Sequence, residues 1–180
     1  MSVEYVPMKP VLVAEPFNDP AWIFERKLDG ERCGALRRKG TVTLLSRTGR
    51  TMGAAYPELE EALSMPGPDV LLDGEIVAFK GGQTSFERLQ RRIALRDPER
   101  ARRTGVAVYY YIFDLLELDG ADLRPLPFVE RRERLHANVA FRSHLRTTWS
   151  RRGSGETAFA EACRRGWEGV VAKRAASPYV

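Results

Sequence analysis

Apolar residues recur along this chain either in strand-like runs or at helical spacing, and each such stretch marks an expected strand or helix. Runs rich in β-branched and aromatic residues, bounded by Gly, Pro or Asp, are typical of strands. Such runs cover residues 22–28, 34–38, 42–46, 70–79, 106–118, 145–150 and 169–174. The first three follow one another closely, so we expect Asp29-Gly30 and Lys39-Gly40 to join them as turns.

Helical spacing of apolar residues separates these runs. It covers residues 56–65, 84–95, 128–138 and 156–165. Thr84-Ser85-Phe86-Glu87 has the capping-box pattern that opens a helix. Pro66-Gly67-Pro68 and Gly166 provide end signals for the first and last helix. Strands that arrive in pairs between helices predict an α+β fold, in which mostly antiparallel sheets pack against helices.

The most informative polar segment lies at the end of the first expected strand and reads Lys27-Leu28-Asp29-Gly30-Glu31-Arg32. A deprotonated lysine amine can attack a phosphoryl group, and the pKa of lysine shifts more readily than that of arginine. A planar guanidinium five residues later can bind phosphate through paired hydrogen bonds. The segment therefore favours covalent chemistry on a nucleotide; the alternative is a strand end followed by a charged turn.

A second polar residue interrupts an apolar run. Glu75 lies inside the strand expected at residues 70–79. Burying an unpaired carboxylate in an apolar strand is costly. We therefore expect Glu75 to face a polar cavity, a cation or a hydroxyl group.

Composition limits the class of partner. The chain has 180 residues, 43% of them hydrophobic and 29% charged, which indicates one soluble globular domain. A net charge of +5 and a pI near 9.5 favour a polyanionic partner, such as DNA, RNA or a nucleotide. No apolar run approaches the roughly 20 residues that cross a bilayer, and residues 1–10 lack a signal-peptide pattern. The sequence thus predicts a cytoplasmic protein with no membrane partner.

Cysteine and histidine residues give no sign of a metal site. Cys33 and Cys163 lie far apart, so we expect neither a zinc site nor a disulfide and interpret both as buried small side chains. His136 and His144 stand in polar stretches without a ligand cluster, which favours surface or structural roles.

Four further motifs follow the lysine segment in a characteristic order. They are Ser46-Arg47-Thr48-Gly49, Leu72-Asp73-Gly74-Glu75, Tyr111-Ile112-Phe113-Asp114 and Glu168-Gly169-Val170-Val171-Ala172-Lys173-Arg174. With these motifs the chain resembles the adenylation domain of ATP-dependent DNA ligases, above all the ligase module of bacterial end-joining ligases. The resemblance implies two antiparallel sheets around a nucleotide cleft, ATP and Mg²⁺ or Mn²⁺ as cofactors, and nicked or broken double-stranded DNA as partner. It also implies a role in DNA repair and recombination.

The resemblance assigns two lysines to the chemistry. Lys27 matches the nucleophile that attacks the α-phosphate of ATP and carries AMP before its transfer to a DNA 5′-phosphate. Lys173 matches a lysine that reaches the α-phosphate. The structural alternative for Lys173 is a strand-end lysine whose stem covers apolar surface.

The other implied site residues bind the nucleotide or the metal ion. Arg32 matches the arginine of the ribose or the DNA 5′-phosphate, and Arg47 one that contacts phosphate or sugar. Glu25 matches a position beside the adenine, and Phe113 the aromatic residue that stacks on it. Glu75 matches a glutamate near the ribose hydroxyls and the metal ion, and Glu168 one associated with the divalent cation.

Several of these assignments have structural alternatives. Both arginines can be solvated strand-end charges, Glu25 an exposed strand residue and Glu168 a turn residue. Aromatic residues at the spacing of Phe113 are often core residues, and only the resemblance favours Phe113 over Tyr109 or Tyr111.

The family pattern continues after Ser177-Pro178-Tyr179 into another lysine motif and an oligonucleotide-binding (OB-fold) domain, whereas this chain stops at Val180. We therefore expect residues 1–180 to form a single, C-terminally incomplete adenylation domain without the OB-fold domain. Three origins remain open: an experimental fragment, a naturally truncated gene, and a product completed by a separate polypeptide. Alternative functions are an RNA ligase or capping-type nucleotidyltransferase, and a non-catalytic nucleotide- or DNA-binding remnant of a ligase.

Overall fold

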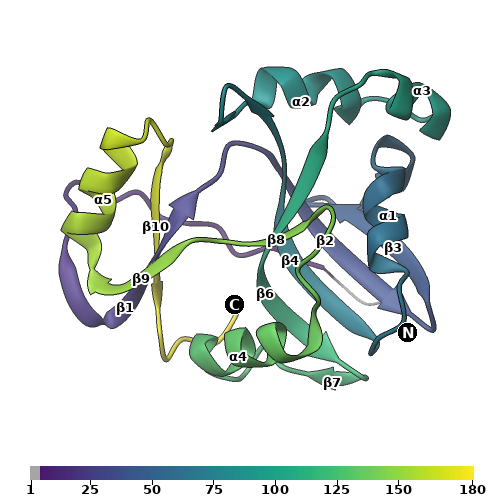
Figure 1. Ribbon diagram of the computed structural model, residues 1–180. Coiled ribbons are helices and arrows are strands. Elements are labelled where there is room, and N and C mark those ends of the chain that lie inside the picture. Colours follow the sequence, from purple (N-terminus) through teal and green to yellow (C-terminus); the bar gives the residue numbers. More distant parts are fainter. Residues whose placement is uncertain (1–4) are drawn as a thin grey trace.

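The fold consists of two sheets with helices packed around them (Figure 1). The structure, a computed structural model, describes residues 5–180. The prediction that residues 1–10 are no signal peptide concerns, for residues 1–4, a part of the chain outside this range. The strands are β1 (Asn18–Lys27), β2 (Glu31–Arg38), β3 (Thr41–Ser46), β4 (Val70–Lys80), β5 (Gln83–Thr84), β6 (Val108–Leu118), β7 (Ala121–Asp122), β8 (Leu145–Thr147), β9 (Ser150–Ser154) and β10 (Gly169–Arg174). The helices are α1 (Pro57–Leu63), α2 (Phe86–Ile93), α3 (Pro98–Arg103), α4 (Phe128–Asn138) and α5 (Gly155–Arg164), with a 3-10 turn at Gly53–Ala55.

The strands form a small and a large sheet. The small sheet has the order β10-β1-β9 and is antiparallel throughout. The large sheet has the order β3-β2-β4-β6-β7, and β5 and β8 pair with β4 and β6. All its pairs are antiparallel except β6 with β8. The expected α+β class with mostly antiparallel sheets is therefore confirmed, and β6 is an internal strand.

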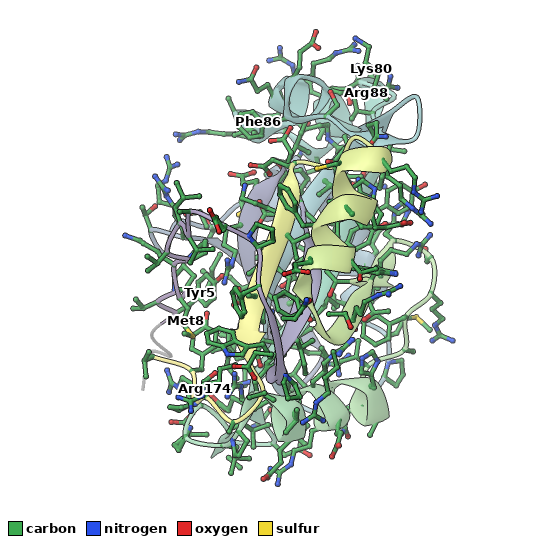
Figure 2. The ribbon with its side chains drawn as sticks, turned by 90° about the vertical axis from the view of Figure 1, so that its left-hand side faces the viewer. Tyr5, Met8, Lys80, Phe86, Arg88 and Arg174 are labelled. Carbon is green, nitrogen blue, oxygen red and sulfur yellow. The ribbon has the colours of Figure 1, made fainter. Side chains whose placement is uncertain are left out.

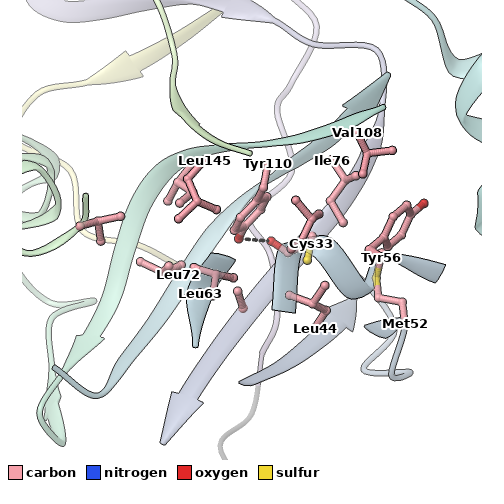
Figure 3. Packing of buried hydrophobic residues seen from close by; sticks show 14 of the residues in the cluster. Cys33, Leu44, Met52, Tyr56, Leu63, Leu72, Ile76, Val108, Tyr110 and Leu145 are labelled. Carbon is pink, nitrogen blue, oxygen red and sulfur yellow. Dashed lines mark hydrogen bonds between the residues drawn. The ribbon is translucent and has the colours of Figure 1, made fainter. Parts of the chain in front are cut away.

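Strand alternation separates the two faces of the large sheet. One face carries residues such as Leu72, Ile76 and Tyr110, which are fully or almost fully buried in the main hydrophobic cluster with residues of α1 and α2 (Figure 3). Tyr110 also donates a hydrogen bond from its hydroxyl to the carbonyl oxygen of Cys33, at 2.8 Å. The opposite face carries Arg32, Glu75 and Phe113, which are only partly buried. The apolar face thus anchors the sheet and leaves the polar face for chemistry.

The small sheet is covered by α5, which lies in front of β10 when the molecule is seen from this side (Figure 2). Phe24 points to α5 and packs edge-on against Phe17, with ring centroids 5.2 Å apart. Ile23 points the other way and is buried with Phe128 of α4. Residues at alternating positions from Ile23 therefore face away from α5.

The Asp29-Gly30 segment is not the hairpin turn that we expected. It connects β1 of the small sheet to β2 of the large sheet, so it crosses between the sheets. The pattern of apolar residues cannot reveal this, because it marks each strand without naming its pairing partner. The expected Lys39-Gly40 turn is confirmed: it joins β2 to β3 with φ values of 48° and 80°, as a two-residue hairpin requires.

Further differences concern element boundaries. The single strand expected over 145–150 is two strands, β8 in the large sheet and β9 in the small one. The cap of α2 is Ser85, whose hydroxyl accepts a hydrogen bond from the Arg88 amide, so Glu87 is not at the capping-box position. Helix α3 was not predicted, although Asp97 caps its first turn and Pro98 follows at its first position.

The crossing between the sheets depends on a glycine, and we predict that Gly30→Ala lowers the free energy of unfolding by about 1–3 kcal/mol. A Cβ at Gly30 would overlap the carbonyl oxygen of Ile76 and lie 2.8 Å from Cγ1 of Val77. A backbone carbonyl cannot rotate away as a flexible side chain can. Urea unfolding measures the change. The control is Gly40→Asn at an open position with φ of 80°, where Asn tolerates the left-handed backbone; equal losses in both variants would contradict the prediction.

Candidate active site

Lys27 lies at the end of β1, where the two sheets approach each other. Its backbone pairs with Gly169 at the start of β10, which brings Glu168 to the same corner. The Lys27 ammonium forms an ion pair with the Glu168 carboxylate, and both side chains are 40% exposed. The lysine is thus held by a carboxylate and remains open to a ligand from solvent.

Glu25 and Lys173 lie on the face of the small sheet that points away from α5. Glu25 is two residues before Lys27, and Lys173 pairs with Ile23 in the register of β1 and β10. Lys173 Nζ lies 2.7 Å from Glu25 Oε2, and Glu25 is only 2% exposed. The alternative of an exposed strand glutamate is therefore wrong. The other oxygen, Oε1, is buried without a hydrogen-bond partner among the described residues, so it can accept a hydrogen bond from a ligand.

The large sheet contributes Arg32, Glu75 and Phe113 from three neighbouring strands. Arg32 of β2 pairs with Glu75 of β4 in the register of these strands. The Arg32 guanidinium lies 4.7 Å from the centre of the Phe113 ring, and Lys173 Nζ lies 4.2 Å from it. Phe113 thus lies between a cation of the large sheet and a cation of the small sheet.

Asp73 was not predicted as a site residue, although it stands in the Leu72-Asp73-Gly74-Glu75 motif. It is fully buried and accepts two hydrogen bonds of 2.7 Å from Arg32, through Nε and Nη2. The hydroxyl groups of Tyr5 and Tyr179 donate two more, at 2.8 and 2.7 Å. The Asp73 carboxylate raises the pKa of the Arg32 guanidinium above its usual value, so Arg32 is held as a cation. Arg32 is therefore not the solvated charge of the structural alternative.

The Asp73 cluster ties both ends of the described chain to the site. The Tyr179 hydroxyl accepts a hydrogen bond of 3.1 Å from the Met8 amide as well as donating to Asp73. Tyr5 and Met8 lie together on one side of the molecule (Figure 2). Gly34 gives the Tyr5 ring room to lie against β2, because a Cβ there would meet the ring at 2.7 Å. The sequence did contain a signal for Asp73 that was missed: it is an aspartate inside an apolar strand. A buried carboxylate in such a strand requires a polar or charged partner.

Glu75 meets the expectation that it faces polar groups. Burial raises the pKa of its carboxyl to about 8, against the attraction of the nearby Arg32 and Lys27 charges. Asp73 and Glu168 raise it further because their negative charges are close. Glu75 and Glu168 thus form a pair of carboxyl groups beside Lys27.

The pair of carboxyl groups fits a divalent cation bound together with phosphate. Mg²⁺ prefers oxygen ligands and keeps several waters, so one or two carboxylates beside a polyphosphate suit it. Among residues 5–180, no group of three or more His, Cys, Asp or Glu residues forms a complete cation cage. The donor set therefore suits a cation that a nucleotide brings with it.

The raised pKa of Glu75 predicts a pH dependence of stability. The folded state holds this proton up to about pH 8, whereas an unfolded glutamate releases it near 4.5. Between these values the unfolded state binds fewer protons, so the contribution of Glu75 to stability is full below pH 4.5 and is lost as pH rises toward 8. We predict that wild type loses more stability than Glu75→Gln between pH 5 and pH 8. Urea unfolding at both pH values tests this, and parallel losses would contradict it.

Arg47 is the predicted site residue that the structure does not bring to the others. It lies exposed in the turn from Ser46 to Arg50, closed by a 2.8 Å hydrogen bond from the Ser46 amide to the Arg50 carbonyl. Within residues 5–180 its side chain forms no hydrogen bond or ion pair. Its assignment stays a prediction, as does the alternative of a solvated charge.

The cysteine and histidine predictions have mixed outcomes. Both cysteines are free; Cys33 is buried as expected, but Cys163 is exposed, so that part of the prediction is wrong. His144 has a structural contact, since its Nδ1 lies 2.8 Å from the Val108 carbonyl oxygen. His136 lies against Phe141, with ring centroids 5.3 Å apart.

Two mostly antiparallel sheets that bring a strand-end lysine, glutamates, an arginine and an aromatic ring together define the adenylation-domain fold of the nucleotidyltransferases. A family model described as "ATP dependent DNA ligase domain" matches residues 7–180. The chain belongs to this family. In the part of the chain that the structure describes, no helix is both long and apolar enough to span a membrane.

Known relatives agree with this membership. The multifunctional non-homologous end joining DNA repair protein LigD of Mycobacterium tuberculosis is 38% identical over 160 residues, which cover 88% of this chain and 20% of the relative. The SPbeta prophage-derived DNA ligase-like protein LigB of Bacillus subtilis is 31% identical over 93% of this chain and 59% of its own length. A structure of mycobacterial DNA ligase D complexed with ATP and MES superposes with a TM-score of 0.79 at 34% identity, over 97% of this chain and 56% of that one. The chain thus spans only part of each relative.

Proposed function

We propose that this chain is the adenylation domain of an ATP-dependent DNA ligase, and that residues 7–180 form one such domain. The observation that carries the proposal is Lys27, held by Glu168 at the corner between the sheets with Glu75 beside it. The similar ligase D structure complexed with ATP supports ATP as the nucleotide.

In the proposed reaction, Lys27 Nζ attacks the α-phosphorus of ATP. A nitrogen–phosphorus bond forms, the bond to the bridging oxygen breaks, pyrophosphate leaves, and the amine releases its protons. Lys173 supplies positive charge for the α-phosphate, as the resemblance implies, while its ion pair with Glu25 fixes its position. AMP then passes to a DNA 5′-phosphate, and a 3′-hydroxyl displaces it to seal the strand.

The remaining residues are proposed to bind and orient the nucleotide. Phe113 stacks on the adenine, and Oε1 of Glu25, which has only a long ion pair of 4.0 Å with Arg132, accepts a hydrogen bond from the base. Arg32 holds the ribose or a DNA 5′-phosphate from its fixed position on Asp73, and the exposed Arg47 adds a contact to phosphate or sugar. Glu75 and Glu168 hold Mg²⁺ or Mn²⁺, which when bound neutralises charge on the phosphates.

Intact-mass measurement after incubation with ATP and Mg²⁺ tests the proposal. We expect one added adenylyl group, mapped by peptide analysis to Lys27. Labelling by GTP in place of ATP would indicate a capping-type enzyme, and transfer to nicked RNA in place of nicked DNA an RNA ligase. ATP binding without any adduct would overturn the catalytic proposal in favour of a non-catalytic remnant.

The proposed partner is nicked or broken double-stranded DNA in repair and recombination. The net charge of +5 favours association with this polyanion. The names of the LigD relatives, which refer to end joining and DNA repair, support the same partner. A separate polypeptide that adds the remaining ligase parts is a further proposed partner; co-purification from the source cells tests for it.

A further inference from the structure

Arg26 is a partly buried cation for which the proposed reaction has no use. It directly precedes Lys27 in β1, so its side chain leaves the opposite face of the strand, the face that α5 covers. Its Nε and Nη2 atoms are buried and have no hydrogen-bond partner. Among residues 5–180 its side chain forms neither a hydrogen bond nor an ion pair with a carboxylate. A buried, charged donor without an acceptor is costly and calls for a ligand.

Aromatic rings hold the Arg26 guanidinium in place. Its central carbon lies 4.7 Å from the centre of the Trp167 ring. Trp149 packs edge-on against Trp167, with centroids 5.5 Å apart, and its carbonyl oxygen accepts the Arg26 amide at 3.2 Å. A guanidinium stacked on an indole is fixed in orientation, while the N–H groups in its plane stay available for an anion.

Other cations surround the same rings. Arg165, which also forms an ion pair with Glu161, lies 5.3 Å from the centre of Trp167, and Arg151 lies 5.8 Å from that of Trp149. Burial lowers the pKa of Arg26; the nearby Tyr111 opposes this shift, and the positive charge of Arg165 adds to it. We call these five residues the tryptophan–arginine cluster: Arg26, Trp149, Arg151, Arg165 and Trp167.

We propose that the tryptophan–arginine cluster binds a phosphate group through Arg26, at a site separate from the one that holds the α-phosphate beside Lys27. Phosphate supplies the acceptor oxygens that the Arg26 donors lack, and it compensates the excess positive charge. Nη1 is the one nitrogen of this guanidinium outside the buried set, so the ligand reaches Nη1 first, and the groups that cover Nε and Nη2 must shift before it binds these donors as well. Trp167 directly follows Gly166, which has a φ of 63°, and lies two residues before Gly169, which has a φ of 153°. With glycines on both sides, its ring can adjust as the ligand binds.

The phosphate has two possible sources, which share this chemistry. It is either a phosphate of the DNA backbone or one from the polyphosphate tail of ATP. Both sources rest on the proposed function. Arg26 and Lys27 leave opposite faces of β1, so the strand separates a phosphate at Arg26 from the α-phosphate beside Lys27.

Binding measurements with Arg26→Met test the proposal. The probes are ATP, by calorimetry without Mg²⁺ so that no adduct forms, and a fluorescein-labelled nicked DNA duplex, by anisotropy at several salt concentrations. For a DNA phosphate we expect about tenfold weaker duplex binding, a salt dependence reduced by about one ion, and unchanged ATP affinity. For an ATP phosphate we expect about tenfold weaker ATP binding and unchanged duplex binding. Arg26→Lys keeps the charge and should recover part of the loss.

The matched control is Arg103→Met on α3, an exposed arginine on the opposite side of the molecule from the small sheet (Figure 1). Thermal unfolding shows whether Arg26→Met folds; removal of an unpaired buried charge should leave stability unchanged or raised. The proposal is overturned if a folded Arg26→Met binds both ATP and the duplex as tightly as wild type does. It is also overturned if Arg103→Met weakens binding as much as Arg26→Met, or if wild type binds neither probe. Lys27→Ala is measured for adduct formation in parallel, so failure of the adenylation proposal is seen independently of the Arg26 result.

Discussion

Lys27→Ala is expected to form no covalent adenylyl adduct under conditions in which wild type is fully labelled. Nζ of Lys27 is the proposed nucleophile, and alanine has no group that can form the nitrogen–phosphorus bond. Lys27→Arg is expected to fail as well, because a guanidinium is not deprotonated near neutral pH. Intact mass after incubation with ATP and Mg²⁺ measures the adduct.

Lys80→Ala is the matched control for this loss. Lys80 is an exposed lysine with a long ion pair of 3.6 Å to Glu87, and its loss should leave labelling unchanged. The Lys27 side chain is 40% exposed, so its removal should change thermal stability little. A Lys27→Ala protein labelled as well as wild type would exclude Lys27 as the nucleophile.

Asp73→Ala is expected to lower the free energy of unfolding by about 3–5 kcal/mol, the range for breaking a buried ion pair. The variant leaves the Arg32 guanidinium without its bidentate partner and two tyrosine hydroxyls without their acceptor. For a domain of this size the midpoint of thermal unfolding should fall by roughly 10 °C. Calorimetry or thermal unfolding by circular dichroism measures the shift.

Smaller changes in the same cluster provide the comparison. Tyr179→Phe removes one hydroxyl and should cost about 1 kcal/mol. Asp122→Ala is the matched surface control; this aspartate forms an ion pair with Arg124 at 2.8 Å and is 49% exposed, so the cost should be under about 1 kcal/mol. Equal stability losses for Asp73→Ala and Asp122→Ala would show that the buried cluster does not stabilise the fold.

Local patterns predicted most elements of the fold but not the pairing of strands. The expected helix over residues 128–138 coincides with α4, and the strand over 169–174 coincides with β10. The Asp29-Gly30 segment misled because Asp-Gly is a common hairpin signal, whereas here the Asp29 carboxylate accepts a hydrogen bond of 3.1 Å from the Phe86 amide at the start of α2. Pairing depends on contacts between distant segments, to which local periodicity is insensitive.

The candidate site was predictable where a motif carried the signal. The motif order identified Lys27 and Glu168, and the structure places them in one ion pair. Asp73 was missed because its partners, Tyr5 and Tyr179, are distant in sequence and belong to no polar motif. Arg26 was missed because only the fold reveals that two of its donor nitrogens are buried without an acceptor.

The Asp73 cluster also sets the order in which the site can mature during synthesis. Its two tyrosines lie 68 residues before and 106 residues after the aspartate. Closing such long loops is entropically slow compared with forming local hairpins such as β2–β3. While the chain emerges from the ribosome, Arg32 and Asp73 can pair early, but the pair stays open to water until Tyr179 is made. A nascent chain halted before Tyr179 would therefore expose the arginine clamp to solvent, and the synthesis of Tyr179 would complete a site that begins at Lys27.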